Sequence, residues 1–217
     1  MPGIYLEQPE DTNFLRFVAT DGHRLAMIDR EVANIEVLRL NPGIILPRKA
    51  AQEMKKIAQE IPVVQFGLKE NHAILAAPNL VFTARLIDGQ YPDYRAVIPQ
   101  IEEKPVLAPR KKLLEALKRI SVISAERYRP VSFNVSPGTL VLVSQHPDLG
   151  EGREKVPIQY EGEEFVLNFN AKYLIDVLEV LGSEEVEFYM RDEDTPCVIK
   201  GPEDTGFLGL VMPMTSV

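Results

Sequence analysis

The sequence predicts an α+β fold made of two similar halves, in which helices pack on antiparallel sheet. Most segments carry apolar residues on alternate positions, which is typical of strands with one buried face. Three longer segments carry them every three or four positions instead, which is typical of helices that bury one side. Short strands joined by tight turns, with helices between them, favour antiparallel sheets covered by helices.

Length and composition limit what the protein can be. A chain of 217 residues with 45% apolar residues can form one large or two modest domains with real cores. The net charge of −8 argues against a protein that binds nucleic acid over its whole surface, but it does not exclude a local basic face that contacts DNA. No apolar run reaches the roughly 18 residues that a membrane span needs, so we expect no membrane partner.

Cysteine and histidine usage predicts neither a disulfide nor a metal site. The single Cys197 cannot form an internal disulfide, which fits a reducing cytoplasm. His23, His72 and His146 are far apart and no paired cysteines accompany them, so we expect no metal. The chain also lacks a glycine loop that would cradle a phosphate, and we expect no cofactor.

The first half of the chain reads as strands around one helix. A polar turn at residues 9–12 follows the first strand, and Asn41-Pro42-Gly43 ends a later one. Ala50, Met54 and Ile57 fall on one face of the expected helix. In order, we predict strands at 4–7, 14–28 (a hairpin), 32–40 and 44–46, a helix at 48–60, and strands at 63–68, 72–77 and 80–87.

The second half follows a charged, proline-containing connection at residues 100–109, the expected linker. We therefore place one domain at 1–99 and another at 110–217. The second domain opens with a helix that buries Leu113, Leu117 and Ile120. Its predicted elements are a helix at 110–124, strands at 131–135, 139–144, 154–160 and 165–167, a helix at 171–181, and strands at 186–190, 196–200 and 207–211.

The two halves repeat one pattern. Val64 and Val186 begin matching strands 122 positions apart, and each half then ends with two more strands. A helix precedes the strand at 131–135, whereas nothing comparable precedes the matching strand at 4–7. We therefore expect the first domain to lack one helix and its leading strand.

A polar turn between two apolar strands at residues 17–28 is the strongest local motif. Asp21-Gly22 suits a hairpin turn, because glycine adopts positive φ without steric cost. His23 and Arg24 follow directly and should be accessible. Aspartate, histidine and arginine so close together could serve catalysis, but an ordinary polar hairpin turn is the simpler interpretation.

Three separated motifs resemble the bacterial DNA polymerase III beta subunit, the replicative sliding clamp. They are Ala19-Thr20-Asp21-Gly22-His23-Arg24-Leu25-Ala26, Tyr91-Pro92-Asp93-Tyr94-Arg95 and Val211-Met212-Pro213-Met214, in the order of that family. The resemblance covers essentially the whole chain and implies a DNA clamp fold. Because a full clamp subunit has three similar domains, it also implies one complete domain and one N-terminally truncated domain, with the first domain absent.

The resemblance further implies a groove between two domains that binds short hydrophobic peptides of polymerase, clamp-loader and repair proteins. Methionine suits such a groove, because its flexible, polarizable side chain adapts to different peptides. Since proline cannot donate to a ladder, we expect Met214 to leave the sheet after Pro213 and reach the surface. The residues implied for the groove are Thr20, Gly22, His23, Arg24, Leu25, Pro92, Val97, Pro196, Leu210, Val211, Met212, Pro213 and Met214.

Some positions depart from the family pattern. Ala96 stands where the family often has a basic residue, and Thr215-Ser216-Val217 replaces a common Arg-Leu ending. Both departures are expected to weaken or retune peptide affinity. Met1 lies where the groove would continue, so the upstream edge of the groove is expected to be incomplete.

Basic residues gather on the sides of two helices opposite the apolar faces. They are Lys49, Lys56, Lys111, Lys112, Lys118 and Arg119. A ring around duplex DNA must touch phosphates without reading bases, so that it can slide. The residues alone fit a solvated face equally well, whereas the resemblance favours contact with duplex DNA, because the family lines its central hole with these helices.

We therefore expect a non-catalytic processivity factor, or the partner-docking fragment of one. A regulatory or decoy fragment would bind the same peptides without encircling DNA. A metal-dependent nuclease would use Asp21, His23 and Asp93. We also expect self-association, or association with a full-length clamp, because a truncated domain leaves an unpaired strand edge and apolar surface.

Overall fold

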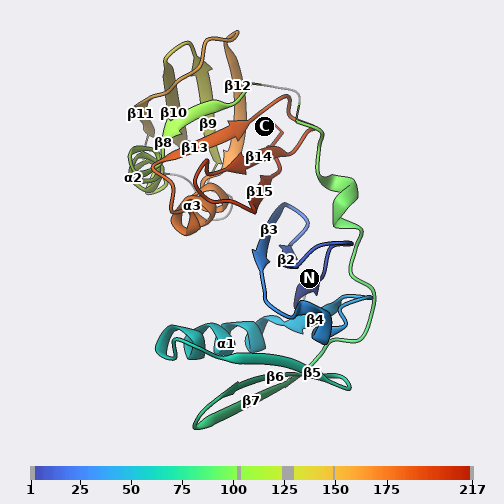
Figure 1. Cartoon of the computed structure of the whole chain (residues 1–217). Helices are drawn as coiled ribbons and strands as arrows, with labels where there is room; N and C mark the ends of the chain where they lie inside the picture. The colour runs from blue at the N-terminus through green and yellow to red at the C-terminus, as the bar shows by residue number, and fades with distance from the viewer. Residues whose placement is uncertain (1–2, 102–103, 124–129, 149, 216–217) are drawn as a thin grey trace. The chain divides into compact units, whose positions relative to one another are not determined.

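The computed structural model of the chain describes residues 3–101, 104–123, 130–148 and 150–215 (Figure 1). It divides into two compact units. Unit 1 comprises Met1–Gly22 and Met27–Tyr94, and unit 2 comprises His23–Ala26 and Arg95–Val217. The short segment His23–Ala26 therefore belongs with unit 2, although it lies in the first half of the sequence. No helix in the described part of the chain is long and apolar enough to cross a membrane.

Unit 1 begins with an antiparallel sheet in the order β4-β1-β2-β3. Its strands are β1 (Gly3–Glu7), β2 (Phe14–Thr20), β3 (Arg24–Glu31) and β4 (Ile44–Pro47). Tyr5 pairs with Val18 on one side and with Ile45 on the other. Alternate residues such as Leu6 and Leu15 turn to the core, as the alternating sequence predicts.

A helix and a second, smaller sheet complete unit 1. The helix α1 (Arg48–Glu60) follows Pro47 and buries Ala50 and Met54. The small sheet has the order β5-β6-β7, with β5 (Gln65–Lys69), β6 (His72–Ala77) and β7 (Leu80–Arg85). The helix has the bounds that the sequence predicts, because its apolar spacing continues up to Glu60.

The predicted strand at 32–40 is wrong, because this segment contains the 3-10 helix η1 (Ile35–Leu38) instead. Asn34 and Arg39 flank it with φ of 59° and 49°, in the left-handed region that interrupts a strand. Ile35 is 1% exposed and anchors the turn in the core. Alternating hydropathy alone could not reveal the two left-handed residues.

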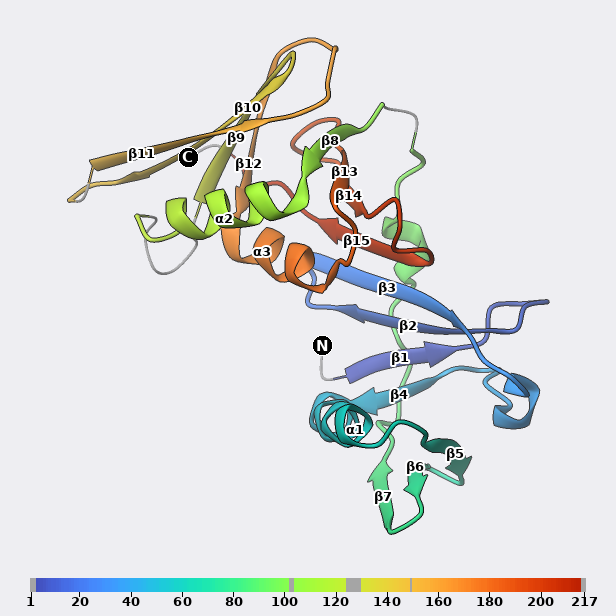
Figure 2. The same cartoon turned by 60° about the vertical axis from the view of Figure 1, so that its left-hand side comes forward.

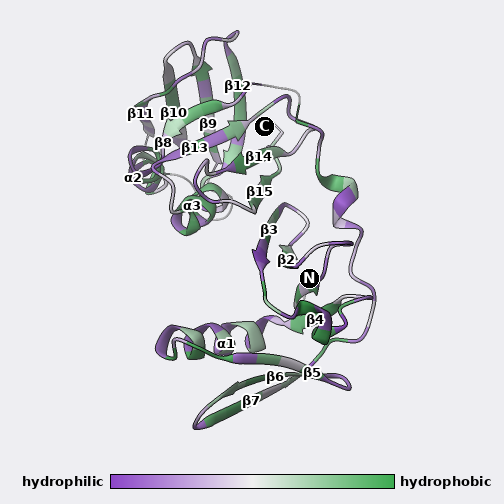
Figure 3. Cartoon of the chain, in the orientation of Figure 1, coloured by the Kyte–Doolittle hydropathy of each residue, from purple (hydrophilic) through white to green (hydrophobic). Residues whose placement is uncertain are grey.

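Unit 2 contains two four-stranded arrangements of antiparallel strands. One has the order β11-β10-β9-β12, and the other has the order β15-β14-β13-β8. The strands are β8 (Val106–Pro109), β9 (Pro130–Ser136), β10 (Thr139–His146), β11 (Gly150–Pro157), β12 (Phe165–Asn170), β13 (Glu185–Tyr189), β14 (Cys197–Lys200) and β15 (Phe207–Val211). In Figure 3, β15 is largely green, the colour of hydrophobic residues, and its last four residues are buried.

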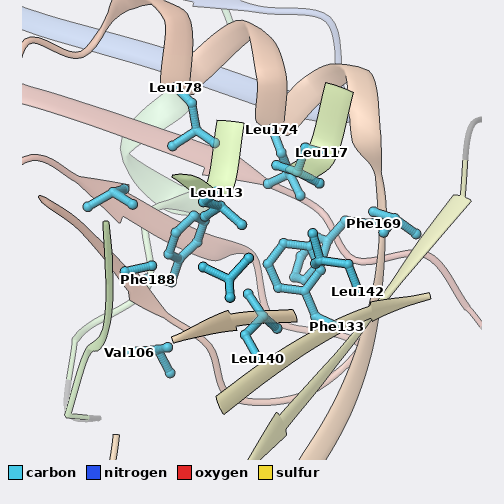
Figure 4. Packing of buried hydrophobic residues seen from close by; sticks show 14 of the residues in the cluster. Val106, Leu113, Leu117, Phe133, Leu140, Leu142, Phe169, Leu174, Leu178 and Phe188 are labelled. Carbon is cyan, nitrogen blue, oxygen red and sulfur yellow. The ribbon is translucent and has the colours of Figure 1, made fainter. Parts of the chain in front are cut away.

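The core of unit 2 lies between these sheets and the helices α2 (Arg110–Ile120) and α3 (Ala171–Val180). The two helices pack against each other and lie side by side in Figure 2. The Phe133 ring meets that of Phe169 edge-on at a centroid distance of 5.2 Å. Figure 4 shows both rings among leucines from the helices, including Leu113 and Leu117. This core confirms the predicted α+β fold with helices on antiparallel sheet.

The strand pairings confirm the internal repeat. In unit 1, β1 pairs with β2 and β4, as β9 pairs with β10 and β12 in unit 2. The helix then follows in both units, and the order β5-β6-β7 matches β13-β14-β15. After the last strand of each repeat, the backbone bonds back to the strand that precedes the helix. Ile87 N–H donates to Ile45 O on β4 at 2.9 Å, and Met214 N–H donates to Asn168 O on β12 at 2.7 Å.

The predicted linker at 100–109 needs a correction at its end. Residues Val106–Pro109 form β8, which pairs with β13 from Phe188 to Glu185. Sequence alone hid this strand, because its partner lies almost eighty positions further along the chain and two prolines flank it. The helix predicted at 110–124 ends at Ile120, and residue 124 lies outside the described residues.

Candidate functional site

The turn at Thr20–Gly22 takes the form that its sequence predicts. Gly22 has a φ of 92°, which favours glycine, and its N–H donates to Thr20 Oγ1 at 3.2 Å. Thr20 and Gly22 belong to unit 1, whereas His23, Arg24 and Leu25 belong to unit 2. The turn is therefore where the chain passes from one unit to the other.

In unit 2, the segment His23–Leu25 meets the end of the chain. Met212 N–H donates to His23 O at 2.9 Å, which fixes the backbone just past β15 against this segment. Cys197 pairs with Val211 in the β14–β15 ladder, so the same register sets Pro196 opposite Met212. The structure thus brings the first and last motifs of the sequence together with Pro196.

The end of the chain leaves the sheet of β15 after Val211, as the sequence predicts, but Met214 then meets the other sheet of unit 2 and is not fully exposed. Met214 forms an isolated antiparallel bridge with Asn168 of β12, and its side chain is only partly exposed. The β15 ladder ends before Pro213, and Met214 directly after it pairs with Asn168 on β12. Thr215 is exposed, while Ser216 and Val217 lie outside the described residues, as does Met1.

Burial separates the residues predicted for the groove into two sets. Leu25, Leu210 and Val211 are 4%, 3% and 0% exposed, so they support the site from beneath and offer no area to a ligand. The accessible set in unit 2 is Arg24, Pro196, Met212, Pro213 and Met214, which are partly exposed, together with His23 and Val97, which are exposed. In unit 1, Thr20 is partly exposed, and Gly22 and Pro92 are exposed. Val97 is 51% exposed at the end of the 3-10 helix η2 (Tyr94–Val97), next to the exposed Ala96.

Arg24 is held by two side chains of α3 that sequence reasoning missed. Its Nη1 lies 2.7 Å from Asp176 Oδ2, and its guanidinium carbon lies 4.4 Å from the centroid of the Tyr173 ring. Tyr173 and Asp176 are three residues apart on the helix, a spacing that puts both on one face. Only the fold could show that this face meets Arg24, 152 positions away in the chain.

This cluster keeps Asp176 ionised. Burial raises the pKa of the Asp176 carboxyl, but hydrogen bonds from Arg24 and Lys172 outweigh it, so the pKa lies below its ordinary value. Lys172 Nζ lies 3.2 Å from Asp176 Oδ1. The ion pair and the aromatic ring therefore fix the Arg24 side chain in one orientation at the edge of the accessible set.

The Tyr91–Tyr94 segment, which contains Pro92, is anchored within unit 1. The Tyr91 ring stacks on Tyr5 at a centroid distance of 4.9 Å, and its hydroxyl donates to Val18 O at 3.3 Å. Tyr94 is 4% exposed, and its hydroxyl donates to the buried carboxylate of Glu7. Both tyrosines have structural partners, so this motif fixes the path of the chain as it leaves unit 1.

Replacing Tyr94 with phenylalanine is expected to lower the free energy of unfolding by about 1–3 kcal/mol, because Glu7 would lose a buried partner. Glu7 is 5% exposed and lies 4.0 Å from the guanidinium of Arg16, which donates two hydrogen bonds of 2.7 Å to the Asp29 carboxylate. Urea denaturation would measure the loss.

Tyr91→Phe is the matched control, because it removes a hydroxyl with a long bond to a backbone carbonyl. It should lower the free energy of unfolding by less than about 1 kcal/mol. Equal losses in the two variants would contradict the role assigned to the Tyr94–Glu7 bond.

The described residues contain no metal-holding group of the kind that a metal-dependent nuclease would need. Asp21, His23 and Asp93 included, no set of three His, Cys, Asp or Glu in the described residues could hold a metal ion. The acidic run at 192–194 forms a turn, in which Asp192 Oδ1 accepts from Thr195 N–H at 2.7 Å. Burial raises the pKa of the Cys197 thiol, which is fully enclosed in the core.

The basic residues predicted to face DNA fall into paired and unpaired sets. Lys118 lies 2.6 Å from Glu179, and Arg119 makes two bonds to Glu154, whose pKa those bonds lower. Lys56 lies 2.8 Å from Glu53 on the same helix. All six predicted residues are exposed, and sequence reasoning missed Arg48 and Lys55, which are also exposed on α1.

Lys49, Lys111 and Lys112 form no ion pair within the part of the chain that the structure describes. Lys111 and Lys112 open α2, where their charges remain available to a phosphate. The paired residues would first have to exchange a carboxylate for a phosphate. The described geometry therefore ranks Lys111 and Lys112 above Lys118 and Arg119 as candidate DNA contacts.

Two family models match the chain. The DNA polymerase III beta subunit, C-terminal domain, matches residues 95–215, and the central domain of the same subunit matches residues 1–93. The beta sliding clamp of Pseudomonas aeruginosa is 34% identical over 215 residues, and that of Haemophilus influenzae is 36% identical over 205 residues. These alignments cover 98% and 93% of this chain, but 57% and 55% of the relatives.

Solved structures give the same result. A sliding clamp from Bartonella birtlesii, solved bound to griselimycin, superposes with a TM-score of 0.91 at 35% identity. The superposition covers 99% of this chain and 58% of that chain. A Pseudomonas aeruginosa clamp gives a TM-score of 0.89 at 33% identity, over 99% of this chain and 58% of that one. From its two domain matches and its fold, the chain belongs to the DNA polymerase III beta subunit family.

Proposed function

We propose that the chain is a non-catalytic DNA sliding clamp component that docks partner proteins in the bacterial cytoplasm. The observation that carries this proposal is the bond from Met212 N–H to His23 O, which joins the first and last motifs in unit 2. Around that bond, Arg24, Pro196, Met212, Pro213 and Met214 offer a partly exposed surface with one cation and four apolar side chains. The chain spans 57% of its Pseudomonas relative, so the activity of a whole clamp is part of the proposal.

We propose short hydrophobic peptides of polymerase, clamp-loader and repair proteins as the partners. The two methionines can adapt to different apolar anchors, and Pro196 and Pro213 are rigid walls that lose little entropy on binding. Arg24 can donate hydrogen bonds to a peptide carboxylate or carbonyl at the edge, because the Tyr173 ring and Asp176 preorganise it. The Bartonella relative bound to griselimycin supports ligand binding by a member of this family.

Thr20, Gly22, Pro92 and Val97 complete the proposed groove. We also propose that the exposed helix cations contact duplex DNA, through phosphates alone. Those residues are Lys49, Lys56, Lys111, Lys112, Lys118 and Arg119, to which Arg48 and Lys55 are added here. A contact of that kind is insensitive to sequence, as sliding requires.

A double substitution, Met212→Ala with Met214→Ala, is expected to weaken binding of a short peptide that carries Leu and Phe by about ten- to a hundredfold. Fully burying one methionine contributes about 1.5–3 kcal/mol, but Met212 and Met214 are already partly buried, so we expect about that amount from the two together, and each 1.4 kcal/mol changes affinity about tenfold. Isothermal calorimetry at one salt concentration would measure the dissociation constants of the unchanged protein and of the double variant.

Met27→Ala is the matched control, because Met27 is also partly exposed but lies on β3 in unit 1. It should leave the affinity within about twofold. The proposed site is refuted if Met27→Ala weakens binding as much as the double substitution. It is also refuted if the unchanged protein does not bind the peptide.

A further inference from the structure

Unit 2 contains an open cleft of about 1210 Å³ that the proposed function does not use. Its walls are the start of β8, the turn between β9 and β10, and residues 158–165, which join β11 to β12. Met190 and Arg191, just after β13, complete the lining. All of these residues belong to unit 2, and none is among those proposed for the groove or for DNA contact.

Backbone hydrogen bonds fix the walls of the cleft relative to one another. Leu107 N–H donates to Gln159 O at 3.1 Å, and Gln159 N–H donates to Leu107 O at 2.8 Å. Gly138 N–H donates to Tyr160 O, and Ile158 N–H donates to Gly138 O, both at 3.1 Å. The cleft is therefore formed before a ligand arrives, which lowers the entropy that binding costs.

The cleft offers aromatic and aliphatic area to a ligand. The rings of Tyr160 and Phe165 meet edge-on, with their centroids 5.8 Å apart and their planes at 82°. Both side chains are partly exposed, as are Pro105 and Leu107 at the start of β8. Such a lining accommodates apolar side chains, and the faces of aromatic rings also attract cations.

Three carboxylates stand on one short loop at the rim of the cleft. They are Glu161, Glu163 and Glu164. All three are exposed, and their side chains form no ion pair within the part of the chain that the structure describes. Two cations also line the cleft, Lys104 and Arg191, but Arg191 Nε already lies 3.9 Å from Asp192 Oδ2. Negative charge therefore dominates the rim, and it favours a cationic ligand.

The Tyr160 side chain holds this loop in place. Its hydroxyl donates to Glu163 O at 2.9 Å. Gly162 passes so close to the ring that a Cβ at this position would overlap the Tyr160 hydroxyl. Only glycine lets the loop follow this path without displacing the ring. The carboxylates are therefore presented by a loop that is packed on an aromatic side chain, which preorganises the rim.

We propose that this cleft binds an extended segment of a partner protein in which basic and apolar side chains alternate. Successive side chains of an extended segment point to opposite sides, so the apolar ones can rest on the lining while the basic ones reach the rim. A lysine or arginine there gains carboxylate partners and the face of an aromatic ring. Phosphates are repelled by the same rim, so the ligand is a polypeptide. This inference goes beyond the proposed function, because the two share no residue.

The probe is the capped, fluorescently labelled hexapeptide Lys-Leu-Arg-Leu-Lys-Leu, and anisotropy at low salt measures its affinity for the full chain. Replacing Glu161, Glu163 and Glu164 together with glutamine should weaken binding about tenfold, because each exposed ion pair changes affinity about two- to threefold. Salt should weaken binding to the unchanged protein much more than to this variant. A peptide with glutamate at each basic position should bind at least about tenfold more weakly than the probe.

A matched control removes the same charge from exposed positions in unit 1, through Glu10→Gln, Glu31→Gln and Glu36→Gln. It should leave the affinity within about twofold, because the rim stays intact. Equal losses in the two triple variants overturn the proposal, since they would show that only the net charge of the chain matters. An acidic peptide that binds as well as the basic one also overturns it, as does a probe that does not bind.

The variant Met212→Ala with Met214→Ala separates this cleft from the proposed peptide groove, and it should bind the basic probe with unchanged affinity. A loss of tenfold or more in this variant would place the probe at the end of the chain and overturn the proposal. Light scattering tests a second copy as the occupant. A dimer that the glutamine triple variant dissociates would show that the rim binds another copy of the chain, which also overturns it.

Discussion

Replacing Phe133 with alanine is expected to lower the free energy of unfolding of unit 2 by about 3–5 kcal/mol. Phe133 is 0% exposed, and its ring lies 5.2 Å from Phe169 and 6.1 Å from Phe188. Truncation leaves a cavity between the two sheets that the surrounding side chains cannot fill without moving the strands (Figure 4). Urea denaturation followed by circular dichroism would measure the total loss, and amide exchange would assign it to unit 2.

Phe14→Ala is the matched control, because it removes the same side chain from a position that is 41% exposed at the start of β2. Its cost should stay within about 1 kcal/mol. If amide exchange in unit 1 accelerated as much as in unit 2 after Phe133→Ala, the two units would not be separately stable. A similar loss in both variants would show that Phe133 is not the centre of the core.

The sequence predicts elements well where their own residues carry the signal. The helix at 48–60 matches α1 at both ends, because its apolar spacing and the preceding proline are local features. The strand β8 and the 3-10 helix η1 were not predicted. Their conformations depend on a distant partner, Glu185–Phe188, and on the left-handed backbone at Asn34 and Arg39.

At the candidate site too, local motifs were predictable from the sequence and distant contacts were not. The motifs mark His23 and Met212 without help from the fold, and the structure adds the hydrogen bond that joins them. The partners of Arg24 could not be inferred, because nothing local to residues 20–26 points to Tyr173 or Asp176 on a helix 150 positions away. Burial was equally hidden, since Val211 and Met212 look alike in sequence but only Met212 is partly exposed.

Electrostatic partners also change how the predicted DNA contacts rank. The sequence treats four basic residues of α2 alike, because all lie opposite its apolar face. In the structure, Glu179 and Glu154 already neutralise Lys118 and Arg119. A phosphate that approached these two would have to displace a carboxylate, whereas Lys111 and Lys112 have no such competitor among the described residues.

Replacing Lys111 and Lys112 with glutamine is therefore expected to remove most of the affinity that α2 gives to duplex DNA. Each lost phosphate contact lowers the slope of log affinity against log salt by about 0.9, so the double variant should lose close to two. Fluorescence anisotropy with a duplex at several salt concentrations measures this slope. Lys118→Gln with Arg119→Gln removes the same nominal charge but should change the slope by less than one. Equal changes in the two variants, or a slope that depends on DNA sequence, would place the contact surface elsewhere.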